Sequence, residues 1–204
     1  MRLEPFISEN GLEIYRTVVV PIQNNVCIVR CFETGDSLLI DAANEHQILI
    51  DISSQLKVKT IVETRGHWDH VGAVEELRNA GYSVGVAEDD ARMLPSFDYL
   101  IEDNQTIAIG RLRFHAILTP GHTPGSVCFT IEGHDLVFSG NTLFPGGPGA
   151  TRFEGGDFPT IIESIETRLF SKLPPQTVVL PGHGPHTTIG EESPKLPEWI
   201  ARGW

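Results

Sequence analysis

The sequence has no long apolar run, few cysteines and little positive charge. A membrane-spanning helix needs about 18 or more consecutive apolar residues, and no such run occurs among the 204 residues. The first ten residues, MRLEPFISEN, lack the basic and apolar segments of a secretory signal peptide. We therefore expect a protein that neither spans a membrane nor is exported, with the cytoplasm as its compartment.

The scarcity of cysteine and of basic residues excludes two further classes of protein. Cys27, Cys31 and Cys128 form an odd set without CxxC spacing, which predicts reduced, buried thiols rather than disulfides. The 15 Lys and Arg residues are outnumbered by 27 Asp and Glu residues, and the net charge of −12 would repel a nucleic-acid backbone. The expected partner is therefore a small-molecule substrate, and neither a nucleic acid nor a membrane.

Hydrophobic patterning indicates a β-rich start, a middle in which helices alternate with strands, and a β-rich second half. The patterns predict strands over 12–20, 26–31, 37–40, 58–63, 82–86, 106–109, 112–118, 126–131, 135–138 and 177–180. They predict helices over 43–56, 70–80, 161–170 and 194–201. Because no linker divides the chain, we expect one domain, 1–204, of the α+β class, with two sheets packed together and helices on their outer faces.

Ligand-type side chains follow several of these predicted strands. They are His67 and His70 in TRGHWDH, His122 in TPGH, Asn141 in SGN and His183 in LPGHG. Neutral imidazoles and a carboxylate on loops held by rigid strands are what a zinc or iron site requires. The sequence therefore predicts a metal site built from loops at the strand ends.

The same segments carry a resemblance to a known family. The runs TRGHWDH at 64–70, TPGHTPGS at 119–126, SGN at 139–141 and PGHG at 181–184 together resemble the metallo-β-lactamase fold superfamily, and its glyoxalase II-like hydrolases in particular. The resemblance implies an αββα sandwich of two mixed β-sheets, with the metal site at one edge of the sheets. In such proteins an HxHxDH motif and three later residues hold two metal ions.

Carried over to this chain, the motif residues divide between the two metal positions. The resemblance places His67 and His122 at the first position, and Asp69, His70 and His183 at the second. All five are therefore candidate metal ligands.

Two residues depart from the family pattern. Arg65 stands where the first histidine is expected, and Asn141 stands where an aspartate bridges the two metals. Arginine stays protonated and cannot bind a cation, and Asn141 offers only an amide oxygen as a ligand. We therefore expect a degenerate first position and a mononuclear centre at the second, with Zn²⁺ as the metal and Fe²⁺ or Mn²⁺ as alternatives.

The resemblance and the departures together predict a hydrolase of a small ester, thioester, lactone or amide. A metal ion polarises a carbonyl and activates water, with Asp69 in the catalytic centre. His67 or His122 would serve as the general base, and Arg65 would hold a substrate carboxylate or the developing oxyanion. Glyoxalase II enzymes carry a further C-terminal helical domain for the glutathione moiety, which makes glutathione thioesters a less obvious substrate.

A second hypothesis retains the fold but assigns the protein no catalytic activity. The two departures would then record the decay of an enzyme into a metal-free, non-catalytic ligand-binding or regulatory protein. In that case Arg65 should pair with Asp69 and cancel its buried charge.

Several neighbouring features have two interpretations. Asp41 either orients a metal ligand or caps the following helix. Trp68 either stacks on substrate or packs beside the site, and the glycine-rich loop over 145–156 either lines a pocket or is a plain surface loop. Thr123 and Ser126 are expected to hold the turn after His122.

Overall fold

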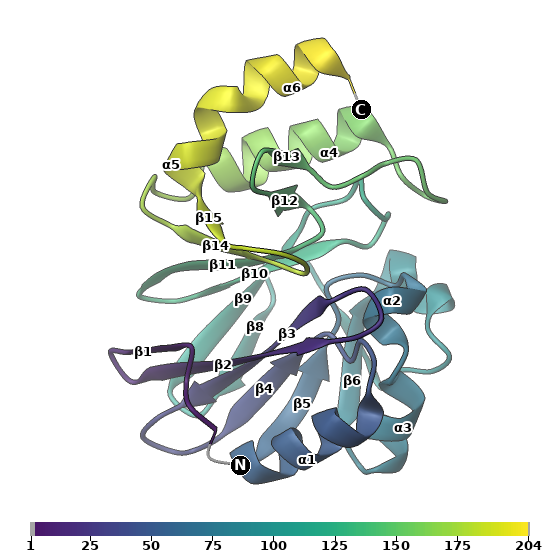
Figure 1. Ribbon diagram of the computed structural model, residues 1–204, viewed down its shortest axis with the longest axis vertical. Helices are drawn as coiled ribbons and strands as arrows, with labels where there is room; N and C mark the ends of the chain where they lie inside the picture. The colour runs from purple at the N-terminus through teal and green to yellow at the C-terminus, as the bar shows by residue number, and fades with distance from the viewer. Residues whose placement is uncertain (1–2, 204) are drawn as a thin grey trace.

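The computed structural model describes residues 3–203, which form two β-sheets packed face to face with helices on both outer surfaces (Figure 1). One helical layer, α1 and α3, covers the first sheet, and the layer of α4 to α6 covers the second. This arrangement confirms the α+β class and the αββα sandwich. Within the described residues no helix is both long and apolar enough to cross a membrane.

The first sheet comes from the first half of the chain, and its seven strands are hydrogen-bonded in sequence order. They are β1 Ile7–Glu9, β2 Leu12–Val19, β3 Asn24–Cys31, β4 Ser37–Ile40, β5 Val58–Val62, β6 Ser83–Ala87 and β7 Tyr99–Ile101. Strands β1 to β4 pair antiparallel, and β4 to β7 pair parallel. The parallel pairs need crossovers, which α1 His46–Leu56, α2 Trp68–Val71 and α3 Val74–Asn79 supply in part.

The second sheet has six strands in the order β15, β14, β11, β10, β9 and β8. Their bounds are β8 Thr106–Ile109, β9 Leu112–Leu118, β10 Val127–Ile131, β11 His134–Gly140, β14 Val178–Pro181 and β15 Thr187–Thr188. Only β11 and β14 pair parallel, so this sheet is mixed as well. The remaining elements are the hairpin β12 Leu143–Phe144 and β13 Gly147–Pro148, α4 Phe158–Ser164 with its π-helical continuation Ile165–Phe170, α5 Ile189–Glu192, α6 Leu196–Arg202, and two 3-10 helices, Glu88–Met93 and Ser193–Lys195.

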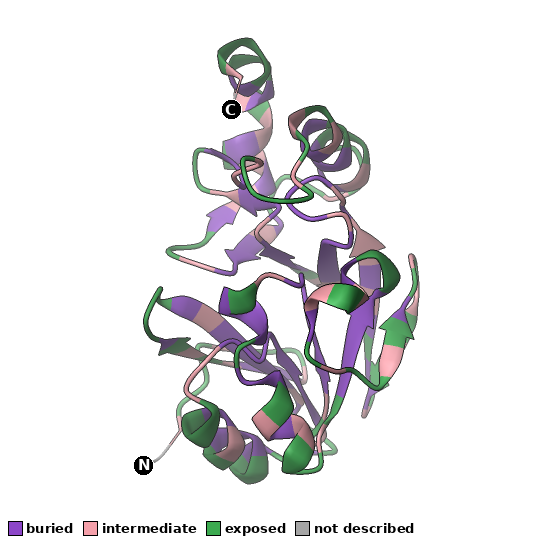
Figure 2. Cartoon of the chain, turned by 90° about the vertical axis from the view of Figure 1, so that its right-hand side faces the viewer, coloured by how far each residue is buried: buried purple, intermediate pink, exposed green. Residues whose placement is uncertain are grey.

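Three apolar layers stabilise the sandwich. Between the sheets, the rings of Phe114 and Phe129 stack with centroids 5.4 Å apart and are fully buried. Leu49 of α1 packs on the outer face of the first sheet, and Ile161 of α4 and Trp199 of α6 pack on the outer face of the second. Figure 2 shows the buried residues concentrated on the sheets and on the inner faces of the helices. Both sheets are thus covered on two sides, as the runs of apolar residues in their central strands require.

The prediction of one continuous helix over 70–80 is wrong. The chain forms α2 and α3 instead, because the segment between them packs against the loop after β4. Ala73 N donates to Ala42 O at 2.9 Å, and a Cβ added to Gly72 would lie 2.6 Å from Ala43 O. Only glycine allows this close approach of two backbones.

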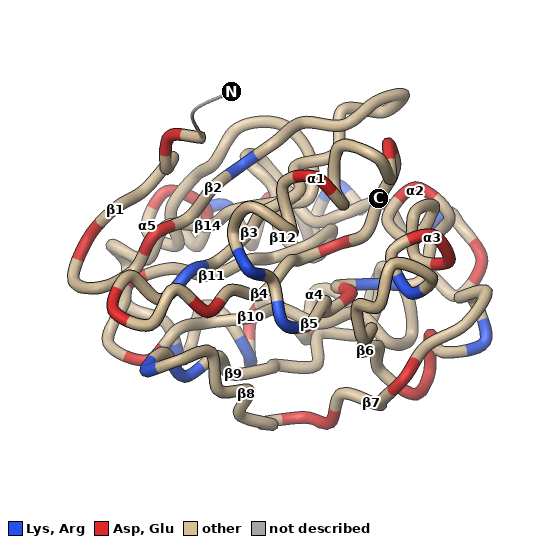
Figure 3. Tube along the Cα trace, turned by 90° about the horizontal axis from the view of Figure 1, so that it is seen from below, with Lys and Arg blue, Asp and Glu red and all other residues tan. Residues whose placement is uncertain are grey.

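The other predictions of local structure are largely confirmed. The predicted strands all form, whereas the short strands β1, β7, β12, β13 and β15 were not predicted. All three cysteines are buried free thiols, as expected. Lys and Arg positions are scattered among the more numerous Asp and Glu positions (Figure 3).

Candidate metal centre

The sequence-predicted site residues meet at one edge of the sandwich. A cleft of about 750 Å³ is lined by Arg65, His67, Asp69, His122, Asn141 and His183. His70 lies fully buried beneath them. The volume is in the range of small-molecule sites, about 300–1,000 Å³. The structure therefore brings together every site residue that the sequence proposed, although Arg65 and His183 are 118 residues apart in the chain.

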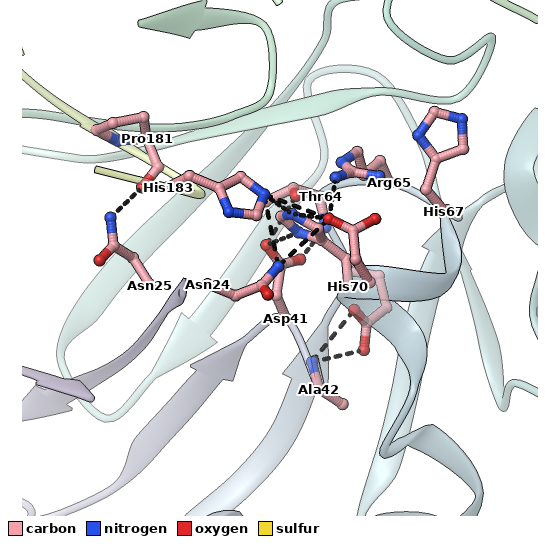
Figure 4. A network of polar contacts seen from close by, with 12 residues as sticks. Asn24, Asn25, Asp41, Ala42, Thr64, Arg65, His67, His70, Pro181 and His183 are labelled. Carbon is pink, nitrogen blue, oxygen red and sulfur yellow. Dashed lines mark hydrogen bonds and ion pairs between the residues drawn. The ribbon is translucent and has the colours of Figure 1, made fainter. Parts of the chain in front are cut away.

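Asp69, His70 and His183 place three ligand atoms around one point. His70 Nε2 lies 3.1 Å from His183 Nε2, and Asp69 Oδ2 lies 3.5 Å and 3.3 Å from these two nitrogens. Ligands about 2.0–2.1 Å from a tetrahedral zinc ion are separated by about 3.3 Å. Figure 4 shows His70 and His183 directed toward this point, with Arg65 beside it.

The proton positions of the two imidazoles are set by their other ring nitrogens. His70 Nδ1 lies 2.7 Å from Asp41 Oδ2, and His183 Nδ1 lies 3.3 Å from Ile22 O. Both partners only accept hydrogen bonds, so each Nδ1 carries the proton and each Nε2 presents a lone pair. Burial lowers the pKa of His70, which keeps the ring neutral. Two lone pairs and a carboxylate oxygen therefore converge, and this donor set fits a cation.

Asp41 holds His70 in place. Its carboxylate accepts hydrogen bonds from Thr64 N at 2.7 Å and Thr64 Oγ1 at 2.9 Å, besides that from His70. The helix α1 instead begins after Glu45 without a side-chain cap. Asp41 therefore orients His70, and the helix-cap alternative is wrong.

Two asparagines at the start of β3 position His183, and neither was predicted from the sequence. Asn25 Nδ2 donates to Pro181 O at 3.0 Å and to Gly184 O at 2.8 Å, on either side of His183. Asn24 is fully buried, with Nδ2 3.4 Å from Asp69 Oδ2 and 3.5 Å from His183 Nε2. Two adjacent asparagines are typical of an ordinary turn, so no sequence pattern indicates that Asn24 and Asn25 contact the His183 segment.

Arg65 fills the place of the missing first histidine. It is 3% exposed, and its Nη2 lies 2.6 Å from Asp69 Oδ2. With the Asn141 amide oriented so that its nitrogen donates to Gly140 O, its oxygen accepts from the same Nη2 at 2.9 Å. Burial alone would raise the pKa of Asp69, but the surrounding His183, His70 and Arg65 side chains bring that pKa well below the ordinary value. The two departures from the family pattern are thus in contact.

His67 and His122 form a separate, hydrogen-bonded pair. His122 Nδ1 lies 2.7 Å from Ala150 O and donates to it, so its Nε2 is an acceptor. That Nε2 lies 3.2 Å from His67 Nδ1, which donates the proton between them. Burial, followed by the charge of Arg65, lowers the pKa of His122 to about 3. Both rings are neutral, and His67 Nε2 is buried without a hydrogen-bond partner among the described residues.

Asp90 ties together the loops that carry these two histidines. It is fully buried and accepts hydrogen bonds from Gly66 N at 2.8 Å, Thr123 Oγ1 at 2.6 Å and Gly125 N at 2.8 Å. Ser126 Oγ accepts from Thr123 N at 3.0 Å, which confirms the predicted turn. Asp90 was not predicted from the sequence, because the acidic run EDD in which it lies is typical of a solvated surface.

The mouth of the cleft is apolar. Trp68 is 66% exposed, Phe153 50% and Ile22 42%, and all three line the cleft. Trp68 therefore faces solvent at the mouth rather than packing beside the site. The glycine-rich loop lines the cleft through Phe153 and an adjoining hollow through residues from Pro145 to Ala150, which confirms its pocket-lining role.

Comparison with known proteins identifies the family. The model of the metallo-beta-lactamase superfamily matches residues 19–183. The chain belongs to the metallo-beta-lactamase superfamily. That range contains all seven site residues, from Arg65 to His183.

Relatives within the superfamily carry hydrolase names. The chain is 33% identical over 203 residues to "Probable metallo-hydrolase YqgX" of Bacillus subtilis, covering 89% of this chain and 95% of that protein. It is 31% identical over 201 residues to "Hydroxyacylglutathione hydrolase GloC" of Haemophilus influenzae, covering 88% and 94%. A solved structure, TTHA1623 in a di-iron-bound form, has a TM-score of 0.77 and 32% identity, covering 88% of this chain and 96% of that one. Both relatives thus carry hydrolase names, and iron is bound in one similar structure.

Proposed function

We propose that this chain is a metal-dependent hydrolase of a small ester, thioester, lactone or amide, with a mononuclear centre at Asp69, His70 and His183. The observation that carries the proposal is the convergence of two imidazole lone pairs and one carboxylate oxygen, 3.1–3.5 Å apart. Among the described residues, His70 Nε2 faces only acceptor atoms, so a cation is the partner that this nitrogen fits.

A divalent cation held there, Zn²⁺ with Fe²⁺ or Mn²⁺ as alternatives, would polarise the scissile carbonyl and lower the pKa of water. The chain supplies the remaining groups. We assign the role of general base to His67, which would accept the proton of the attacking water, because it lines the same cleft and its Nε2 has no hydrogen-bond partner among the described residues. The water oxygen forms a bond to the carbonyl carbon, and the bond to the leaving group breaks as that group receives the proton from His67.

His122 has a different role from His67 in this scheme. Both of its ring nitrogens are engaged, Nδ1 with Ala150 O and Nε2 with His67, so it orients His67 and fixes its tautomer. The geometry therefore favours His67 as the base over the second candidate. Arg65 contributes positive charge next to Asp69, at the sequence position where the resemblance places a histidine ligand of the first metal.

The name of one relative bears on the substrate. GloC is covered over 94% of its own length, so a protein without much additional chain carries the name hydroxyacylglutathione hydrolase. The length argument against glutathione thioesters therefore loses its force. We include glutathione thioesters among the candidate substrates.

A specific observation supports the metal-free alternative. The Arg65–Asp69 pair that it predicts is present at 2.6 Å. An ionised carboxylate has about four lone-pair sites, however, so the pair leaves Asp69 able to bind a cation as well.

Metal content and turnover test the proposal together. The protein is purified without chelator, analysed by mass spectrometry, and assayed on esters, thioesters and lactones with Zn²⁺, Mn²⁺ and Fe²⁺. About one equivalent of metal with hydrolysis supports the mononuclear hydrolase. About two equivalents would contradict the degenerate first position, and no metal after loading would favour the binding protein.

A further inference from the structure

Arg65 lines the cleft, and one nitrogen of its guanidinium is buried without a hydrogen-bond partner among the described residues. Arg65 Nη2 is occupied by Asp69 and Asn141, whereas no acceptor of the described chain reaches Nη1. The side chain is 3% exposed, and a guanidinium stays protonated in proteins. A buried charged donor without an acceptor is unfavourable. Arg65 Nη1 is therefore a donor for an anionic acceptor that the chain itself does not supply.

The rest of the cleft restricts what that anion can be attached to. Among the described residues that line the cleft, Arg65 is the only Lys or Arg. The mouth is formed by Ile22, Trp68 and Phe153, which are 42–66% exposed. Large exposed apolar side chains gathered around one opening mark a binding surface for an apolar group. The cleft thus combines a single buried positive charge with a largely apolar entrance, to which Glu154 adds one exposed carboxylate.

We infer that the substrate carries one carboxylate, which binds Arg65 Nη1, and an apolar body, which lies against Ile22, Trp68 and Phe153. A planar guanidinium and a carboxylate form strong, charge-assisted hydrogen bonds. Because Arg65 contacts Asp69, which is a proposed metal ligand, the carboxylate of the substrate would lie close to the bond that is cleaved. This inference names the substrate class of the proposed hydrolase and rests on that proposal for the reaction, but not for binding.

The binding test uses two probes of similar shape, the anion 3-phenylpropanoate and the neutral 3-phenylpropanamide. Isothermal titration calorimetry is carried out on the full chain, both as purified and after metal removal with EDTA. Metal removal is essential, since a carboxylate could otherwise bind the metal. We expect the metal-free protein to bind the carboxylate at least about tenfold more tightly than the amide.

Variants assign this preference to Arg65. In Arg65→Gln the carboxylate should bind no more tightly than the amide, and Arg65→Lys should restore part of the preference. The matched control is Arg152→Gln, because Arg152 is an exposed arginine beside the same cleft, with its guanidinium 4.9 Å from the Phe153 ring centroid. Arg152→Gln should keep the preference. Since Arg65→Gln leaves Asp69 as an unpaired buried charge, the double variant Arg65→Gln/Asp69→Asn provides a neutral, folded comparison.

Equal binding of the two probes to the metal-free protein would overturn the inference, as would a preference that survives Arg65→Gln or disappears in Arg152→Gln. Hydrolysis separates this failure from that of the proposed function. The metal-loaded protein is assayed on the 4-nitrophenyl monoester of glutarate and on 4-nitrophenyl pentanoate. Turnover of both at equal kcat/KM would retain the hydrolase and reject the carboxylate site. Arg65-dependent binding without turnover of either ester would support the carboxylate site and count against the hydrolase.

Discussion

The two halves of the cleft have similar residues at similar spacing, yet they differ in where their protons lie. We call the half with Asp69, His70 and His183 the second-metal half, and there His70 Nε2 and His183 Nε2 are 3.1 Å apart. We call the half with His67 and His122 the first-metal half, and there His67 Nδ1 and His122 Nε2 are 3.2 Å apart. The first of these pairs brings two lone pairs together, whereas the second shares a proton. A short distance between two histidine nitrogens is therefore not enough to identify a metal site.

The difference comes from the partners of the other ring nitrogens. Asp41 and Ile22 O both accept, which turns two lone pairs of the second-metal half inward. In the first-metal half only His122 Nδ1 has such a partner, Ala150 O, and His67 Nδ1 is free to donate to its neighbour. The outer hydrogen bonds thus decide which half fits a cation, with Arg65 as the fixed charge between them.

Removing Asp69 should have the largest effect on this comparison. We expect Asp69→Ala to weaken metal binding by more than the about 10–100-fold that the loss of an outer hydrogen-bond partner costs, because it removes a ligand. Metal content by mass spectrometry and Zn²⁺ titration with a competing chelator measure the change. His46→Ala, which removes a half-exposed histidine, is the control for adventitious binding and should retain the metal. Retention of metal by Asp69→Ala would show that the centre lies elsewhere.

Restoring the first position should convert one half into the other. In the double variant Arg65→His/Asn141→Asp, we expect the metal content to rise from about one to about two equivalents, because a third histidine and a bridging carboxylate join His67 and His122. The single variant Asn141→Asp is the control, since Arg65 still occupies the position there. Metal content is again the measurement. No gain in the double variant would mean that something besides Arg65 and Asn141 prevents metal binding in that half.

The sequence predicted the candidate ligands of the site better than the buried polar residues that hold those ligands in position. His67, His122 and His183 follow strands at glycine-containing turns, and this local pattern survives without knowledge of the fold. Asp90 and Asn24 were missed because their partners are distant: Asp90 binds Gly125 35 residues away, and Asn24 contacts Asp69 45 residues away. Nothing in a local pattern distinguishes such a buried polar residue from one in a surface turn.

The fold shows the same division. Strands with period-two or continuous apolar patterns were predictable, whereas β1 and β7 are edge strands of three residues each, too short for a pattern. The break between α2 and α3 depends on the contact of Gly72 with Ala43 O, which belongs to another element. Apolar periodicity continued across that break, so only the packed structure revealed it.

The acid sensitivity of the metal-free protein should report on the histidine pair. The pKa of His122 is lowered to about 3 in the folded state, against about 6.5 in the unfolded chain. Between these values the unfolded state binds more protons, so the free energy of unfolding falls as pH falls, by up to about 1.4 kcal/mol per pH unit for this one group. Urea unfolding at several pH values in this window should show a shallower pH dependence for His122→Gln than for wild type. Identical pH dependence in the two proteins would contradict a neutral, buried His122.

The smallest effect is expected at Trp68, which lies between His67 and Asp69 in the chain but belongs to neither half of the cleft. Its side chain is 66% exposed at the mouth, so Trp68→Ala should leave metal content and both histidine pairs unchanged. The loss of an aromatic contact of about 0.5–1.5 kcal/mol predicts a KM about two- to tenfold higher with kcat nearly constant. Phe32→Ala is the matched control, because Phe32 is 64% exposed and does not line the cleft. A fall in kcat at constant KM would instead place Trp68 in the chemistry of the reacting atoms, and the division of the cleft into two polar halves beneath an apolar mouth would need revision.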